Sequence, residues 1–172
     1  MIEQKPDRNL RLVEIIEKNP GIQFRQIMRF TGMKNGVLSH YLGKLEKNGT
    51  VNVERGSRQT RFYPPKITKE ESNIIKALRR QTPRDIMLAL IKNGDEGLAF
   101  SEIVKEVRKS PSTVSLYLSQ LVEDDIVYKK FVYSKKTYQI KDRYIIDKLI
   151  EDYRPGILER PSDSFADIIN SL

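Results

Sequence analysis

The chain of 172 residues has no cysteine and only one histidine, His40. Without thiols, both disulfides and thiolate metal ligands are excluded. A single imidazole supplies too few ligands for structural zinc, so we expect neither a metal nor a cofactor. No run of 18 apolar residues is present, which excludes a membrane-spanning helix, and no apolar stretch follows the N-terminus as in a secretion signal. We therefore expect a cytoplasmic protein.

The usual components of catalytic sites are also scarce. There is no glycine-rich phosphate loop and no cysteine nucleophile, and His40 falls on a predicted exposed helix face. The acidic pairs Asp124-Asp125 and Glu151-Asp152 fall at a helix end and in an acidic tail, where solvated surface is a better interpretation than paired acid and base. The sequence therefore predicts that the protein is not an enzyme.

Positive charge is in excess, and most of it lies in the first third of the chain. The formal net charge is +8, of which residues 1–66 contribute +7 through 13 Lys/Arg against 6 Asp/Glu. Residues 142–172 carry a net charge of −3. Clustered basic charge indicates a polyanionic partner. We expect its main contact in the N-terminal part.

An internal repeat with an offset of 76 residues organises the sequence. The run GIQFRQI at 21–27 aligns with GLAFSEI at 97–103, and LSHYL at 38–42 aligns with VSLYL at 114–118. Further matched pairs are Leu45 with Leu121, Val51 with Val127, and Phe62 with Tyr138. We interpret this as two copies of one unit, copy one within residues 1–66 and copy two within residues 67–141.

Hydrophobic periodicity and caps predict three helices and a β-hairpin in each copy. For copy one the helices are predicted at 8–19, 24–31 and 35–48, and the strands at 51–53 and 60–63. For copy two the helices are predicted at 83–93, 101–108 and 111–124, and the strands near 127–133 and 136–140. A capping box at 68–71 predicts one more helix over 69–80, and Thr82-Pro83 predicts the cap of the next.

The predicted fold class is mainly α with small β-hairpin wings (α+β), as tandem winged helix-turn-helix domains plus C-terminal helices. Pro64-Pro65 marks a boundary, because proline neither continues a helix nor donates to a strand ladder. We predict an N-terminal winged helix-turn-helix at 1–66, a linker helix with a second winged helix-turn-helix at 67–141, and a C-terminal helical tail at 142–172.

The tail carries two apolar stripes that must be buried somewhere. Tyr144, Ile145, Leu149 and Ile150 form one, Phe165, Ile168, Ile169 and Leu172 form the other, and Pro155-Gly156 and Pro161 separate them. The stripes can pack on copy two or pair with a second chain. We expect a homodimer through the C-terminal half, because two-fold dimers place recognition helices on successive turns of DNA.

The helix over 35–48 is the predicted groove-reading helix of copy one, with apolar residues inward and hydrogen-bonding residues outward. Asn35 and Ser39 suit base edges, whereas Lys44 and Lys47 are better placed for phosphates. Glycine inside a helix permits either close approach of a sugar-phosphate backbone or packing against another helix. The candidate DNA-binding residues of this helix are Lys34, Asn35, Gly36, Ser39, His40, Gly43 and Lys44.

The hairpin of copy one carries Arg55, Arg58 and Arg61 around a Gly56-Ser57 turn. Such arginines can contact phosphates or enter a narrow minor groove. A basic loop is often only solvated. Because this one directly follows the groove-reading helix, we favour DNA contact for all three arginines.

Copy two has the same predicted helices and hairpin, but its outward helix face carries side chains that are less suited to reading bases. Its candidate DNA-binding residues are Ser112, Thr113 and Ser115 on the helix and Lys135 and Lys136 on the hairpin. Leu116 could touch a thymine methyl group or mark a protein-facing surface. RNA binding is less favoured, because no exposed aromatic platform is evident and Tyr41, Phe62 and Tyr117 fall at predicted core positions.

By these residues the chain resembles the archaeal and bacterial winged-helix regulators related to the MarR and ArsR groups. The run NGVLSHYLGKLEKNG at 35–49 is similar to the family pattern that leads from the recognition helix into the wing, and STVSLYLSQL at 112–121 matches it in copy two. The tandem arrangement resembles archaeal regulators with two helix-turn-helix domains, such as the euryarchaeal archaellum regulators. The metal-sensing cysteines and histidines of many ArsR relatives have no counterpart.

The sequence thus predicts a sequence-specific transcription regulator that binds double-stranded promoter DNA. Its recognition helix would enter the major groove, and its basic wing would lie on phosphates or in the minor groove. The alternative is a winged-helix protein-interaction module of the basal transcription machinery, with basal transcription factors as partners. Copy two and the tail fit that alternative best.

Overall fold

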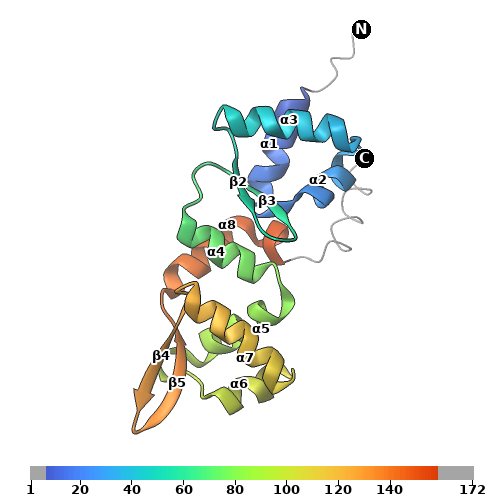
Figure 1. The fold of residues 1–172 in the computed structure, drawn as a ribbon. Helices are drawn as coiled ribbons and strands as arrows, with labels where there is room; N and C mark the ends of the chain where they lie inside the picture. The colour runs from blue at the N-terminus through green and yellow to red at the C-terminus, as the bar shows by residue number, and fades with distance from the viewer. Residues whose placement is uncertain (1–6, 159–172) are drawn as a thin grey trace. The chain divides into compact units, whose positions relative to one another are not determined.

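The computed structural model describes residues 7–158, which are mostly helical and include two small antiparallel sheets (Figure 1). Contacts divide them into two compact units. The first contains the described residues up to Ser72 and those from Tyr153 onward, and the second is Asn73–Asp152. The predicted fold class, helical with small β-hairpins, is confirmed. The domain limits after residues 66 and 141 stay a prediction.

The first unit has three helices followed by a hairpin, in the predicted order. These elements are α1 (Arg8–Lys18), α2 (Phe24–Thr31), α3 (Asn35–Lys47), β2 (Asn52–Arg55) and β3 (Thr60–Tyr63), and the unit also includes the first turn of α4 (Lys69–Leu78) and the end of α8 (Arg143–Leu158). The sequence did not predict β1 (Ile22–Gln23), which pairs antiparallel with β3 and gives the strand order β1-β3-β2. This third strand fixes the hairpin to the segment that leads into α2.

One hydrophobic core holds α3 in place within this unit. Leu38, Leu42 and Leu45 recur at helical spacing on α3 and are buried against Leu12 and Ile16 of α1. Burying each such side chain contributes about 1.5–3 kcal/mol. Because the apolar stripe of α3 faces this core, the opposite side of the helix faces outward.

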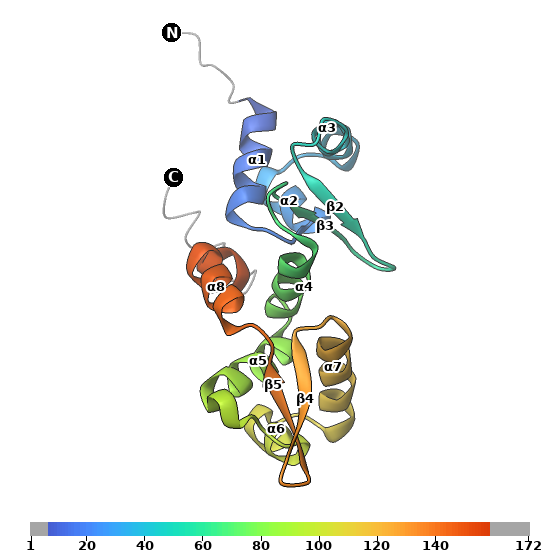
Figure 2. The same cartoon turned by 90° about the vertical axis from the view of Figure 1, so that its left-hand side faces the viewer.

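The second unit repeats this plan. It contains the later part of α4 (Lys69–Leu78), then α5 (Gln81–Asn93), η1 (Gly94–Glu96), α6 (Phe100–Val107), α7 (Pro111–Glu123), β4 (Val127–Val132), β5 (Lys135–Ile140) and the earlier part of α8 (Arg143–Leu158). In Figure 2 the β4–β5 hairpin extends beside α7. Thr82 does not cap α5 as predicted, because the helix begins earlier at Gln81 and Pro83 lies inside its first turn.

The repeat also appears in the backbone geometry. Left-handed residues recur at the offset of 76, as Gly32 (φ 65°) with Arg108 (φ 55°) and Gly49 (φ 74°) with Asp125 (φ 60°). The pairing of Ile22 with Phe62 recurs as the bridge between Leu98 and Tyr138. The two predicted copies are therefore two instances of one fold.

The first helices of the copies do not follow this offset. Asn19 donates its side-chain amide to the Ile15 carbonyl, and Asn93 donates in the same way to the Ala89 carbonyl, so these helices correspond at an offset of 74. The short helix η1 accommodates the difference before the chain returns to the repeat at Gly97. Copy two thus has an insertion where copy one makes a direct turn.

α8 differs from the predicted tail. The helix does not end at Pro155-Gly156, because non-helical angles at Tyr153 (φ −131°, ψ 19°) restart it and place the proline in the new first turn, where its missing N–H is tolerated. Tyr144 is 76% exposed and does not belong to the buried stripe, whereas Ile146 and Leu149 do. The second predicted stripe, residues 165–172, lies outside the described residues.

Candidate nucleic-acid interface

The turn before α3 determines how the helix begins. Gly32 ends α2 in the left-handed conformation, with φ 65°. The Thr31 hydroxyl donates to the Ile27 carbonyl at 2.8 Å and accepts from the Met33 amide at 3.3 Å. Extended backbone at Lys34 then starts α3 without a side-chain cap. This is the tight turn of a helix-turn-helix, and it presents the first residues of α3 outward.

The exposed face of α3 brings together the candidate residues that the sequence assigned to this helix. The exposed polar residues and glycines there are Lys34, Asn35, Gly36, Ser39, His40, Gly43, Lys44 and Lys47, and the apolar Val37 is 38% exposed among them. The Ser39 hydroxyl donates to the Asn35 side-chain oxygen at 3.2 Å, a bond that does not use the Asn35 amide hydrogens. The His40 ring packs edge-on against Tyr41 at 5.7 Å between centroids. The face therefore presents polar groups in a partly preset arrangement.

Both helix glycines of α3 lie in the open. A Cβ atom added to Gly36 or Gly43 would have no heavy atom within 4 Å beyond its own helix and chain neighbours. Packing against another described helix therefore does not explain these glycines. Because His40 lies four residues after Gly36 and three before Gly43, the three residues form one stripe with little steric bulk on either side of the imidazole.

Wing one, residues 52–63, is tied to α3 by an ion pair. Both terminal guanidinium nitrogens of Arg55 donate to the carboxylate of Glu46, at 2.6 and 2.7 Å. This hydrogen bonding holds the pKa of Glu46 below its ordinary value and raises the pKa of Arg55. The pair is exposed, so its contribution to stability is small. Arg55 is therefore oriented beside α3 rather than free in solvent.

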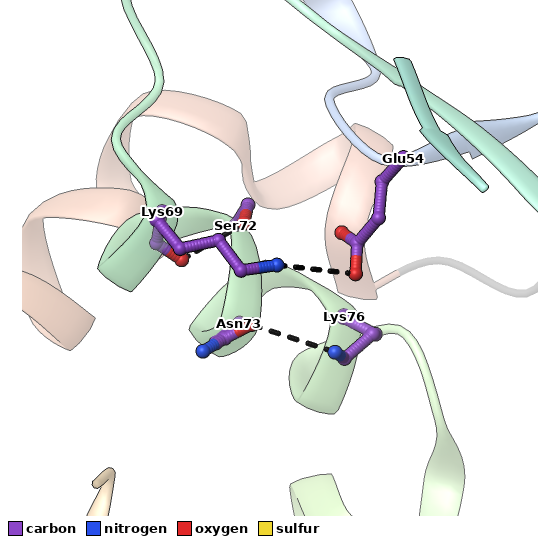
Figure 3. A network of polar contacts seen from close by, with 5 residues as sticks. All are labelled: Glu54, Lys69, Ser72, Asn73 and Lys76. Carbon is purple, nitrogen blue, oxygen red and sulfur yellow. Dashed lines mark hydrogen bonds and ion pairs between the residues drawn. The ribbon is translucent and has the colours of Figure 1, made fainter. Parts of the chain in front are cut away.

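The opposite face of wing one is also held. Glu54 accepts from the Lys69 ammonium at 3.4 Å, at the first residue of α4 (Figure 3). The predicted capping box starts this helix, because the Thr68 amide donates to Glu71 at 2.8 Å and the Glu71 amide donates to the Thr68 hydroxyl at 3.1 Å. Neighbouring residues Glu54 and Arg55 thus anchor the two faces of one strand.

Arg61 requires a correction. The sequence placed it on the exposed wing with Arg55 and Arg58, but its residue is only 6% exposed. Its guanidinium donates to the Gly21 carbonyl at 2.8 Å and to the Gln59 side chain at 3.0 Å, because β1 covers the edge of β3. Arg61 therefore stabilises the sheet, whereas Arg58 lies exposed in the loop.

In copy two, the start of α7 holds two of the predicted residues together. The Ser110 hydroxyl accepts from the Thr113 amide at 3.3 Å and lies 3.1 Å from the Ser112 hydroxyl and 2.8 Å from the Thr113 hydroxyl. These side chains cap the helix and are less available to a ligand than those of α3. Ser115 is exposed, and Leu116 beside it is 56% exposed.

Wing two, residues 127–140, presents aromatic side chains that sequence reasoning missed. Phe131 is 71% exposed and Tyr133 is 100% exposed, whereas the sequence suggested no exposed aromatic platform. Tyr133 (φ 47°) and Ser134 (φ 65°) form a two-residue turn with left-handed backbone, which normally favours Asn-Gly. The run FVYSKK contained this signal, since it joins two strand patterns without a glycine.

The predicted lysines of wing two differ in their surroundings. Lys135 pairs with Glu102 of α6 at 3.1 Å. Two hydrogen bonds keep the pKa of Glu102 below its ordinary value. The larger effect comes from the Ala99 amide, and the next from the Lys135 side chain. Lys136 extends over the Tyr138 ring with 5.5 Å from its nitrogen to the centroid. Lys135 and Lys136 therefore belong to opposite faces of the hairpin.

Among residues 7–158, no group of three or more His, Asp or Glu side chains could hold a metal ion. No helix within the same range is long and apolar enough to cross a membrane.

These features define two winged helix-turn-helix units in tandem. Comparison with protein families agrees: residues 6–75 match the HVO_0163-type model described as an N-terminal HTH domain. Residues 80–129 match the model of the bacterial regulatory proteins of the arsR family. No curated protein matches the chain. The chain therefore contains two tandem HTH domains, of which the second matches the ArsR-family model, and these domains indicate a DNA-binding regulator.

Proposed function

We propose that the protein is a sequence-specific regulator of transcription, with α3 as its reading helix in the major groove of double-stranded promoter DNA. The outward face of α3 carries the proposal. It offers Asn35, Ser39 and His40 in one exposed patch, with Lys34 and Lys44 at its borders. Asn suits adenine, Ser suits either base type, and lysine suits phosphate.

The shape of this face supports close contact. A helix with its side chains is about 10–12 Å wide and the major groove is about 12 Å wide, so bulky outer residues would limit how deeply it enters. Gly36 and Gly43 reduce that bulk on both sides of His40. Arg58 on wing one would reach phosphates or the minor groove beside it, and Arg55 would do so from its position next to Glu46.

Direct binding measurements test this function. We expect the full chain to bind random-sequence duplex DNA at low salt and to bind one genomic promoter fragment more tightly, as measured by fluorescence anisotropy. Footprinting would then locate the site. Failure to bind any duplex at low salt would contradict the proposal, and equal affinity for all duplexes would contradict sequence-specific reading.

We further propose a homodimer that binds a two-fold site. The sequence at 165–172 supports this, because its apolar spacing predicts a helix face that requires a buried surface. Light scattering on the 20.0 kDa chain should give twice that mass, and a chain ending after Leu158 should give the monomer. The truncation must not be made earlier, because Tyr153 and Ile157 are buried in the first unit. If the shortened chain were still a dimer, residues 159–172 would not be part of the dimer interface.

A protein-interaction module of the basal transcription machinery is the second candidate. Leu116 favours it, because this apolar side chain is 56% exposed on α7 where copy one has His40. Under this alternative, L116S would impair transcription in a reconstituted basal system without changing affinity for duplex DNA. Reduced duplex affinity of L116S would assign the residue to DNA contact instead.

A further inference from the structure

The tip of wing two combines an unusual backbone with a fully exposed ring. Tyr133 has φ 47° and is 100% exposed, so neither backbone preference nor burial accounts for a tyrosine there. Two-residue turns with this backbone favour Asn-Gly, and left-handed backbone is strained for a bulky residue. The turn nevertheless closes a continuous ladder, because six residue pairs join β4 and β5 up to Val132 opposite Lys135.

Positive charge surrounds this tip. Residues 127–140 contain four lysines and no Asp or Glu. Phe131 lies opposite Lys136 in the ladder, and Lys129 lies two residues before Phe131, so these three side chains share one face of the hairpin. Lys130 and Lys135 share the other face, where Lys135 pairs with Glu102. Both faces therefore carry lysine next to an aromatic tip.

From this juxtaposition we propose that wing two is an aromatic wedge for duplex DNA. Tyr133 stacks against bases from the minor groove, Phe131 supports it, and Lys129, Lys130 and Lys136 contact the flanking phosphates. Apolar and aromatic side chains at basic surfaces enter base steps in this way, and stacking tolerates any sequence because every base has a π-face. The inference rests on the proposed DNA-binding function and adds a second, sequence-independent contact to α3.

The charge pattern favours nucleic acid over a protein partner. The centres of protein interfaces are depleted of lysine, whereas phosphate contacts depend on it. An exposed apolar patch made for a protein would therefore not need four lysines within 14 residues. Duplex DNA offers a row of phosphates to the lysines of wing two and stacked π-faces to its aromatic rings.

A tryptophan at the tip provides a direct test, because the chain contains no tryptophan. In the full-length variant Y133W, all tryptophan emission reports on position 133. We expect random-sequence duplex DNA to quench this emission as binding proceeds. Heparin, a polyanion without bases, should bind the lysines without comparable quenching. The matched control is Y144W, since Tyr144 is 76% exposed in the same unit but lies on α8, and its emission should stay constant.

A second variant measures the contribution of the ring. Asparagine suits the left-handed turn, so Y133N should keep or raise the thermal midpoint of unfolding. Its affinity for random-sequence duplex should fall about tenfold, within the range for loss of one stacked base. Normal duplex affinity of Y133N together with unchanged Y133W emission would overturn the wedge while leaving the function of α3 intact. Absence of duplex binding by every variant, including the natural chain, would instead overturn the proposed function on which the wedge rests.

Discussion

Copy one and copy two place different chemistry at equivalent positions of one frame. At the offset of 76, Gly36 corresponds to Ser112, His40 to Leu116 and Gly43 to Ser119. The buried positions instead keep their apolar character, as Leu42 and Leu118 do. Packing restricts the inward face of each helix in the same way, so the two copies can differ in function only on their outward faces.

The two wings extend this difference. Arg55 pairs with Glu46 in copy one, and the equivalent positions in copy two are Phe131 and Val122. Wing one has four-residue strands around a loop with Arg58, whereas wing two has six-residue strands and a two-residue turn. Copy one is therefore suited to charged and hydrogen-bonded contacts, and copy two adds aromatic surface.

The largest expected effect concerns the reading face of α3. The double variant N35A/H40A should lose at least about 30-fold in the ratio of affinities for the promoter site and random duplex, because each of the two base contacts discriminates by about 1–3 kcal/mol. Anisotropy titrations with both duplexes measure this ratio. The control S119A changes an exposed residue of α7 that is not among the candidate DNA-binding residues, and it should leave the ratio nearly unchanged. A uniform loss on both duplexes would refute base reading by α3.

The next effect separates Arg61 from Arg58. R61A should lower the free energy of unfolding by about 1–3 kcal/mol, because the buried Gly21 carbonyl loses its charged donor. R58A, at an exposed position, should change stability by less than about 0.5 kcal/mol but reduce the slope of binding against salt by about one. Urea unfolding and salt titrations measure the two quantities. If R61A were as stable as the natural chain, its structural role would be wrong.

The third prediction compares how alanine at Gly36 or Gly43 changes the stability of the protein and its affinity for DNA. G36A and G43A should each stabilise the protein by up to about 1 kcal/mol, because alanine is the better helix former and no heavy atom of the neighbouring structure lies within 4 Å. Both should weaken duplex binding if the DNA backbone approaches α3 there. Thermal unfolding and anisotropy give the two values. Improved stability with unchanged affinity would mean that the DNA does not come close at these residues.

The smallest effect is a dependence of stability on pH. Partners lower the pKa values of Glu46 and Glu102, so both carboxylates contribute stability above the pKa of an unfolded glutamate. This contribution disappears as the pH falls through the lower pKa of the folded state. Urea midpoints of the natural chain and E46Q should therefore differ slightly at neutral pH and converge in acid. A difference that persists in acid would mean that Glu46 acts through packing instead.

Most of the frame could be predicted from local pattern. The leucine stripe of α3, the cap at Ser110-Pro111 and the capping box at Thr68 each depend on residues within about two turns of helix, so the sequence alone indicates them. The helices and hairpins of both copies accordingly lie within a few residues of their predicted limits.

The missed features depend on contacts between distant residues. β1 has only two residues and exists because it pairs with β3, some 40 positions later, and that pairing buries Arg61. The continuation of α8 past Pro155 likewise depends on packing, since Tyr153 and Ile157 are buried and a side chain at Gly156 would collide with the Lys18 carbonyl. Local periodicity contains no information about such contacts.

The sequence by itself determined the two copies, their helix-turn-helix order and the concentration of positive charge in copy one, because repeats, periodicity and charge are properties of the chain. Only the tertiary structure decided which basic and aromatic side chains remain available to a ligand. It buried Arg61, paired Arg55 with Glu46, left Gly36 and Gly43 open and exposed Tyr133. Exposure is the outcome of how separate segments pack, and no single segment encodes it.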